Sequence, residues 1–357
     1  MLVDLSHAPP PGETIFGLLA LSEMGLPAVL LGDATELDRL YPDHGMLLVP
    51  GIVDTHALAG ILFGITQRQD EVAELLQESG QSRERINQLD RQLDRLHHEL
   101  EGASELQKRS LPHPLQSIAG GSINTLWKPA GQVSGDLAQV IKLTDGCTAM
   151  VVADSIGHGV PAAMLSMILQ RTLTEAHQSG EQSLLRSPSR MLSLLNESLV
   201  RTAGDETRFA TAIYAVFDSR TNGLRVGAAG HPTPIVSRPD GTLKRLPVQG
   251  PLLGLFAGES YPDTEWTLAP ADRVVLYSDG IEQVSMCRRS PRCTTAAEAV
   301  EDLVRAASVT GEPAWFIERI EAELEAHEDR RTGEDIDDLT MLCLTVDPLR
   351  MIDRRAA

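Results

Sequence analysis

Short apolar runs from about residue 111 onward predict β-strands, and longer stretches between them carry apolar residues at helical spacing. The predicted strands cover residues 148–153, 210–217, 224–228, 273–277 and 340–346. The predicted helices cover residues 162–177, 189–203, 296–307 and 315–327. Strands interspersed with a few long helices predict an α+β fold, a β-sandwich flanked by helices.

A heptad pattern precedes these elements. The a and d positions between residues 72 and 103 hold Val72, Leu75, Ile86, Leu89, Leu93, Leu96, Leu100 and Ala103. Most other positions are Glu, Gln, Arg or Asp, which is typical of a coiled coil and predicts a homodimer formed through this helix. Ser79 and Ser82 interrupt the apolar positions. That interruption leaves open the alternative of a long amphipathic helix packed on its own C-terminal domain.

The first 66 residues form a separate short segment. Apolar runs at 28–31 and 46–49 alternate with stretches that could be helical, which predicts a small α/β unit. The chain therefore divides into four predicted parts. They are the α/β segment at 1–66, the coiled-coil helix at 67–110, the β-sandwich domain at 111–347 and a tail at 348–357.

Composition narrows the classes of partner and compartment. The formal net charge of −19 over 357 residues would repel nucleic acid and anionic membranes, so neither is an expected partner. The four cysteines have no C-x-x-C spacing, which argues against a disulfide framework or a structural zinc site. No signal-like N-terminus or membrane-length apolar run is present, and a cytoplasmic protein is predicted.

Acidic residues gather where predicted strands end. Asp136, Asp154 and Asp279 each lie beside a small residue, and Asp337 is followed by Asp338. An aspartate next to a small residue at a strand end places a carboxylate where the backbone can approach a ligand closely. Several such oxygens together would suit Mg²⁺ or Mn²⁺. Two such ions can activate a bridging water and hold phosphoryl oxygens. Taken alone, however, an Asp-Gly pair is more often a turn than a ligand.

These acidic sites belong to a series of ordered motifs. The motifs are LQKRSLP at 106–112, WKPAGQVSGD at 127–136, ADSIGHGVPAA at 153–163, FATAIY at 209–214, AAGHP at 228–232, LYSDG at 276–280 and DDLT at 337–340. In order and spacing this series resembles the metal-dependent serine/threonine protein phosphatases, in their bacterial SpoIIE-like and RsbU-like branch. The resemblance covers residues 106–346 and implies two packed β-sheets with a dinuclear centre at one edge.

The resemblance implies a ligand set and a reaction. The carboxylates of Asp136, Asp154, Asp279 and Asp337 and the carbonyl of Ser155 would hold two Mn²⁺ or Mg²⁺ ions. The four aspartates would also be the catalytic residues, and metal-activated water would attack phosphoserine or phosphothreonine directly. No G-x-S-x-G or cysteine nucleophile motif suggests a covalent intermediate.

Further roles follow from the same resemblance. Asp338 would support the ligands from behind, and Gly157 and Gly159 would shape the backbone turn. His158 would lie near the phosphate, with a helix N-cap or a loop-packing role as the alternative. His231 is interpreted as structural.

The resemblance also implies a substrate. It would be a phosphorylated STAS-type anti-sigma-factor antagonist, or a similar small regulatory protein, in a partner-switching pathway.

Two alternative functions make different predictions. A catalytically inactive phosphatase-like module that sequesters a partner need not bind metal, and a nucleotidyl cyclase would need only two essential aspartates and would lack the 153–163 block.

Two motif positions depart from the family pattern. The family's Gly-Gly-Asp-Phe-Tyr-Asp is SGDLAQ at 134–139, so Ser134 replaces a glycine and a second acid is absent. Gln283 stands where a glutamate is usual. Neither change removes a predicted metal ligand, and an active enzyme remains the main interpretation.

The N-terminal segment resembles the second half of a response-regulator receiver domain, in a degenerate or truncated form. Residues 1–6, 17–31 and 45–50 carry the resemblance, and the phosphoacceptor would fall on Asp4. The acidic pair that holds Mg²⁺ in receivers is missing. Val49 stands in place of the usual Lys and Gly32 in place of a Ser or Thr. These departures argue against a phosphorylation switch.

Overall fold

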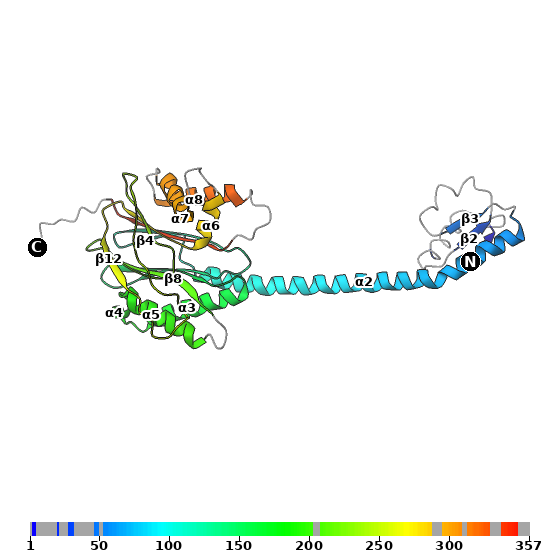
Figure 1. Cartoon of the computed structure of the whole chain (residues 1–357), viewed down its shortest axis with the longest axis horizontal. Helices are drawn as coiled ribbons and strands as arrows, with labels where there is room; N and C mark the ends of the chain where they lie inside the picture. Colours follow the sequence, from blue (N-terminus) through cyan, green and yellow to red (C-terminus); the bar gives the residue numbers. More distant parts are fainter. Residues whose placement is uncertain are drawn as a thin grey trace, which may run out of the picture. The chain divides into compact units, whose positions relative to one another are not determined.

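A computed structural model describes residues 2–4, 20, 28–31, 46–49, 53–202, 208–287, 295–308, 313–328 and 337–348. The chain forms two compact units, Met1–His97 and His98–Ala357 (Figure 1).

The N-terminal unit contains a three-stranded parallel sheet in the order β1-β2-β3. Its strands are β1 (Leu2–Asp4), β2 (Ala28–Leu31) and β3 (Met46–Val49), so the two predicted strands are confirmed residue for residue. Val29 and Leu30 in the central strand are buried, as expected for a strand with neighbours on both edges. Asp4, the position resembling a phosphoacceptor, is the last residue of β1.

One long helix, α2 (Thr55–Ser110), follows and begins well before the predicted boundary at residue 67. The heptad leucines in its middle are exposed, at 59% for Leu75, 58% for Leu93 and 55% for Leu96. Near the end of the helix, Ser104 and Gln107 are buried. The alternative of a helix packed on its own domain therefore applies only to the last turns. No helix in the described part of the chain is both long and apolar enough to cross a membrane.

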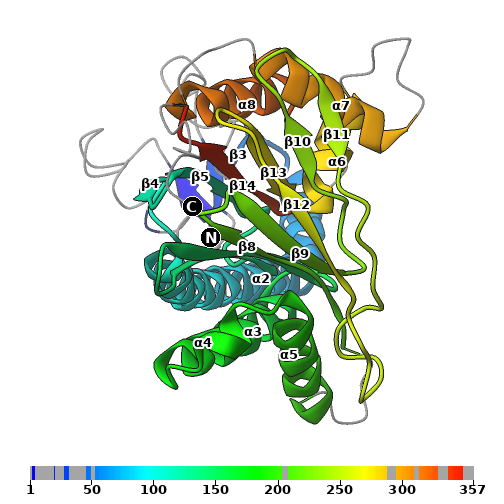
Figure 2. The same ribbon diagram turned by 90° about the vertical axis from the view of Figure 1, so that its left-hand side faces the viewer.

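The C-terminal unit is a sandwich of two antiparallel sheets with helices outside, which confirms the predicted fold class (Figure 2). The six-stranded sheet has the order β11-β10-β13-β14-β5-β4 and the five-stranded sheet has the order β12-β9-β8-β7-β6. The strands are β4 (Leu115–Ile118), β5 (Gly121–Lys128), β6 (Asp136–Lys142), β7 (Cys147–Ser155), β8 (Ala210–Asp218), β9 (Gly223–Ala229), β10 (Ile235–Ser237), β11 (Leu243–Arg245), β12 (Asp263–Thr267), β13 (Arg273–Tyr277) and β14 (Leu339–Val346).

Helices cover both outer faces of the sandwich (Figure 2). The helices are α3 (Val160–Gln178), α4 (Gln182–Leu185), α5 (Pro188–Thr202), α6 (Asp279–Cys287), α7 (Ala296–Ala307) and α8 (Pro313–Glu328). The first three cover the five-stranded sheet and the last three cover the six-stranded sheet.

Strand β7 shows why the central strands appear in the sequence as continuous apolar runs. Met150 and Val152 pack between the sheets, whereas Val151 and Ala153 pack toward α3 and α5.

Several elements differ from the predictions. The sequence favours loops at residues 178–189 and 286–295. The first of these stretches contains α4, and α6 was not predicted because its first residues were assigned to a strand-end motif. Met286 and Cys287, placed in a predicted loop, end α6, and residues 288–294 of that loop lie outside the described chain.

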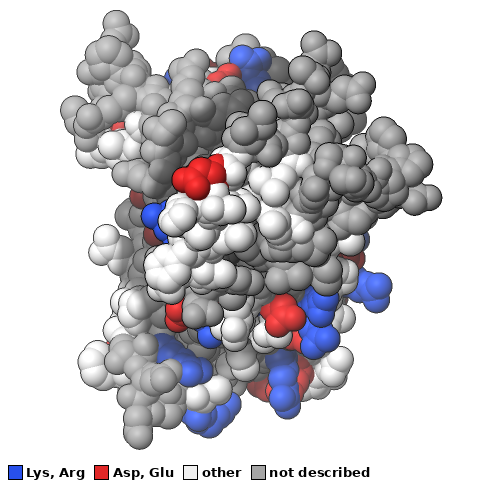
Figure 3. All heavy atoms as spheres, turned by 90° about the vertical axis from the view of Figure 1, so that its right-hand side faces the viewer, with Lys and Arg blue, Asp and Glu red and all other residues white. Residues whose placement is uncertain are grey.

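Charged side chains of both signs are interspersed on the face drawn in Figure 3, without one dominant acidic patch among the residues described there.

Candidate active site

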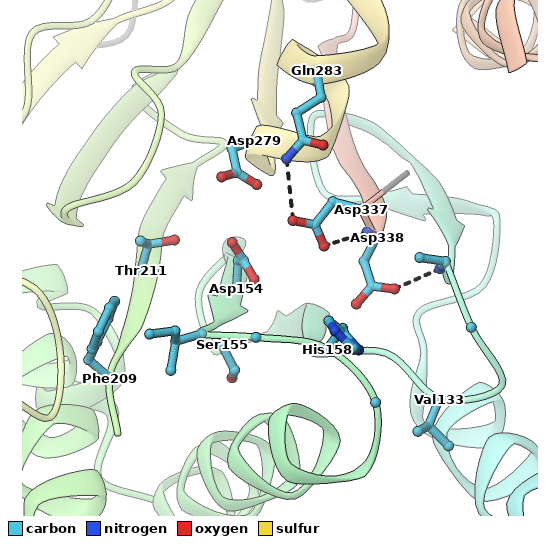
Figure 4. Close-up of a pocket in the computed structure, with 15 residues that line it drawn as sticks. Val133, Asp154, Ser155, His158, Phe209, Thr211, Asp279, Gln283, Asp337 and Asp338 are labelled. Atoms are coloured by element: carbon cyan, nitrogen blue, oxygen red, sulfur yellow. Dashed lines mark hydrogen bonds between the residues drawn. The ribbon is translucent and has the colours of Figure 1, made fainter. Parts of the chain in front are cut away.

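An open pocket of about 840 Å³ lies where the predicted acidic motifs meet (Figure 4). Asp154 comes from β7, Asp279 is the first residue of α6, and Asp337 and Asp338 immediately precede β14. All four line the pocket. Asp136 is different, because it is only 4% exposed and does not line the pocket, although it lies directly opposite Asp154 in the β6–β7 pair.

Two glycines allow the motif backbones to approach each other. A Cβ on Gly135 would lie 2.9 Å from the Cβ of Ala162, tighter than real Cβ contacts. A Cβ on Gly280 would collide with the backbone oxygen of Asp338. Close packing therefore requires glycine at positions 135 and 280. Each glycine allows the aspartate beside it to take its position.

Asp338 connects the last acidic motif to the loop before Asp136. Its Oδ1 accepts a hydrogen bond from the Ala130 amide and its Oδ2 accepts one from the Gly135 amide, both at 2.7 Å. The side chain is nearly buried. Short bonds of this kind to an ionised carboxylate are strong, so Asp338 fixes the loop that leads into β6.

Asp337 is held at both of its carboxylate oxygens. The amide of Asp338 donates to Oδ1 at 2.9 Å, and Nε2 of Gln283 donates to Oδ2 at 3.3 Å (Figure 4). Gln283, noted in the sequence as a departure, is thus in direct contact with a predicted ligand.

Burial and neighbouring carboxylates raise the pKa values of three acidic residues at the site, Asp136, Asp154 and Asp279. The pKa of Asp154 is raised to about 7, first by burial and then by the charges of Asp279 and Asp337. Burial and Asp154 raise the pKa of Asp136 well above its ordinary value. Burial and Asp337 also raise the pKa of Asp279. Such crowding of acids favours a bound cation, which would stabilise their ionised forms.

The donor set fits a hard divalent cation. Oδ2 of Asp136 and Oγ of Ser155 are buried without a hydrogen-bond partner, and all the predicted ligand atoms are oxygens. Within the described residues, however, no group of three or more His, Cys, Asp or Glu side chains already has the geometry of a metal site. Asp154, Asp279 and Asp337 nevertheless face the same pocket (Figure 4).

The raised pKa of Asp154 predicts a pH dependence of stability. Between its ordinary pKa of 3.8 and about 7, the folded metal-free chain holds a proton that the unfolded chain has lost, so stability falls as pH rises. We expect the free energy of unfolding to drop by roughly 1 kcal/mol between about pH 6 and pH 8, a shift of a few degrees in Tm. Melting curves in chelator for the wild type and Asp154→Asn test this, because Asn removes the contribution of this carboxyl and should make the fall in stability smaller. Equal slopes for both proteins would contradict it.

His158 and Gly157 also line the pocket, as the sequence predicted for residues near a phosphate. The residue that caps α3 is Gly159, with a φ of 73°, and not His158. Gly157 likewise has a positive φ of 85°, a conformation that favours glycine. The N-cap interpretation of His158 is therefore wrong, and its place near a phosphate stays a prediction.

Thr211 is a pocket residue that the sequence interpretation missed. It lies opposite Asp154 in the β7–β8 pair, and its Oγ1 is 2.8 Å from Nδ1 of buried His231. Burial lowers the pKa of His231 to about 3, so the ring is neutral. His231 therefore contacts the pocket wall. The available signal for Thr211 was a polar residue near the start of the largely apolar strand β8.

Gln107 was also missed, although it connects α2 to the first acidic motif. Its Oε1 accepts a hydrogen bond from the Ser134 amide at 3.0 Å, and its Nε2 donates to the Ser134 carbonyl at 2.9 Å. The Ser134 hydroxyl in turn accepts from the Asp136 amide at 3.0 Å. The serine that replaces a family glycine thus helps to orient a predicted ligand.

Comparisons with known proteins place the chain in a family. A family model described as Stage II sporulation protein E (SpoIIE) matches residues 144–347. The chain is 28% identical to phosphoserine phosphatase RsbU of Bacillus subtilis over 52% of this chain and 53% of RsbU. It is 26% identical to RsbP of the same organism, over 51% of this chain and 45% of RsbP. The chain thus spans about half the length of these relatives.

A solved structure agrees at the level of the fold. The SiaA-PP2C domain of Pseudomonas aeruginosa superposes with a TM-score of 0.59 at 22% identity. The match covers 72% of this chain and 99% of that domain.

Proposed function

The chain belongs to the SpoIIE family, as its motifs predicted, and from this membership we propose that it is a metal-dependent protein serine/threonine phosphatase. The observation that carries the proposal is the meeting of Asp154, Asp279 and Asp337 in one pocket from segments far apart in the sequence. Its test is phosphate release from a phosphoserine protein with Mn²⁺. Phosphate release that continues in the presence of a chelator would contradict the proposal.

The residues that would hold two Mn²⁺ or Mg²⁺ ions are Asp136, Asp154, Asp279 and Asp337, with the carbonyl of Ser155. Bound divalent ions supply two kinds of chemistry at such a site, a lowered pKa of the attacking water and neutralisation of phosphoryl charge. The protein's own part is orientation. Asp338 fixes the loop before Asp136, and the backbone around Gly157 shapes the pocket floor beside α3.

For the substrate we propose a phosphorylated small regulatory protein of the STAS-type anti-sigma-factor antagonist class, acting in cytoplasmic partner switching. RsbU and RsbP, each matched over about half of its length, are named phosphoserine phosphatases, which supports a phosphoserine protein as substrate. An open pocket suits a phosphorylated side chain presented on a protein surface.

We also propose that α2 forms a homodimer through its heptad leucines. Exposed leucines at a and d positions are the residues that a parallel or antiparallel partner helix would cover. Replacing Leu89 and Leu96 by Lys is expected to convert the dimer to a monomer, measured by light scattering across a range of concentrations. Lys at exposed Asn87 and Gln88, at the b and c positions away from a partner helix, is the matched control. A wild type that is monomeric at all concentrations would contradict the dimer.

Gln107 would couple α2 to catalysis, because its amide holds the backbone just before Asp136. Gln107→Ala leaves the buried amide and carbonyl of Ser134 without these partners, at a cost of roughly 1–3 kcal/mol. We expect kcat to fall about tenfold or more with a smaller change in KM. Glu105→Ala, on the exposed side of the same turn, is the control. An unchanged kcat at saturating metal would contradict the coupling.

A further inference from the structure

Gln283 is an uncharged side chain that lines the acidic pocket. It lies one helical turn after Asp279 in α6, so both side chains are on the same helix face, and both line the pocket. Its Nε2 donates to Oδ2 of Asp337 at 3.3 Å (Figure 4). No sequence motif assigns a role to a glutamine at this position.

The contact completes the support of Asp337. Because the Asp338 amide already donates to Oδ1, the Gln283 amide fixes the second oxygen and so the plane of the carboxylate. Donors behind a ligating carboxylate set its orientation and contribute to metal affinity. A carboxylic acid at the same position would lose this donor and would add a negative charge beside Asp154, Asp279 and Asp337.

We propose that Gln283 is a positioning residue that sets the affinity of the pocket for divalent cations, by holding Asp337 and by keeping the charge at this position neutral. The inference rests on the proposed function, because it concerns the same cation site. It predicts effects of opposite sign for two substitutions at one position. A merely structural role would not produce that pattern.

The test is calorimetric titration of Mn²⁺ into the metal-free full-length chain. Gln283→Met keeps the length of the side chain but removes the donor, and we expect it to weaken Mn²⁺ binding about tenfold. Gln283→Glu adds one charge near the bound ion, and we expect it to tighten binding about tenfold. Gln178→Glu, an exposed residue at the end of α3, adds the same charge elsewhere and controls for long-range attraction.

The outcomes separate this inference from the proposed function. Mn²⁺ binding by the wild type with the same Kd in both variants, or weakened binding in Gln283→Glu, would overturn the role of Gln283 and leave the phosphatase proposal in place. A wild type that binds no Mn²⁺ would overturn both. Thermal melts of each variant in chelator check that a loss of binding does not come from unfolding. If Gln283→Met is the only variant that folds, it still tests the hydrogen-bond donor.

Discussion

Asp154→Ala is expected to lower kcat/KM for a phosphoserine substrate by about 10³-fold or more while the chain stays folded. Asp154 lies in the pocket at the end of β7, and the charges of Asp279 and Asp337 both act on it. Its removal would take away a central anionic oxygen donor. It would also relieve a buried carboxyl with a raised pKa, so the metal-free variant should be no less stable than the wild type.

Steady-state kinetics and thermal melts measured together check this expectation. Asp263→Ala is the matched control, because Asp263 is an exposed aspartate on the edge strand β12 of the same sheet. It should leave turnover unchanged. Wild-type kinetics in Asp154→Ala would contradict the assignment of this pocket as the active site.

Asp338→Ala is expected to reduce turnover about 100-fold and to destabilise the fold by roughly 2–5 kcal/mol. The carboxylate accepts two short hydrogen bonds from the amides of Ala130 and Gly135, and both would lose this partner. The loop leading to Asp136 would then lose its fixed position. Chemical denaturation and kinetics under saturating Mn²⁺ measure the two effects.

Asp338→Asn tests how far the loop depends on both acceptor oxygens of this side chain. Asn keeps one acceptor oxygen but turns an N–H toward the other amide, so an intermediate loss of stability and of turnover is expected. If both Asp338 variants matched the wild type in stability, the loop would not depend on this side chain, contrary to the geometry.

The strands with continuous apolar runs could be predicted because both of their faces are buried. β7 and β14 pack between the sheets on one side and against helices on the other, which produces an unbroken apolar pattern. The edge strand β12 (DTEWT) alternates between half-buried and exposed positions and lacks this signal. The helix α6 begins at Asp279 itself, so a motif interpreted as a strand end hid a helix start.

The acidic motifs could be found in the sequence because their local spacing is distinctive, but the residues that support them could not. Gln107 and Ser134 are 27 positions apart, and Asp338 and Gly135 are 203 apart. Nothing in a single sequence indicates such pairings, since they depend on how the sheets stack and on which loop faces which strand. Thr211 and His231 meet for a similar reason, through the bridge between Ala212 and Gly230.

The most direct test of the central claim is a paired measurement on the metal-free full-length chain. Mn²⁺ is titrated by calorimetry, and phosphate release from a phosphoserine peptide is followed in the same sample, with Asp154→Ala beside the wild type. The phosphatase account predicts Mn²⁺ binding and metal-dependent release by the wild type, with release lost in the variant. If the wild type neither bound Mn²⁺ nor released phosphate, that result would contradict the phosphatase account. It would favour the inactive module that sequesters a partner.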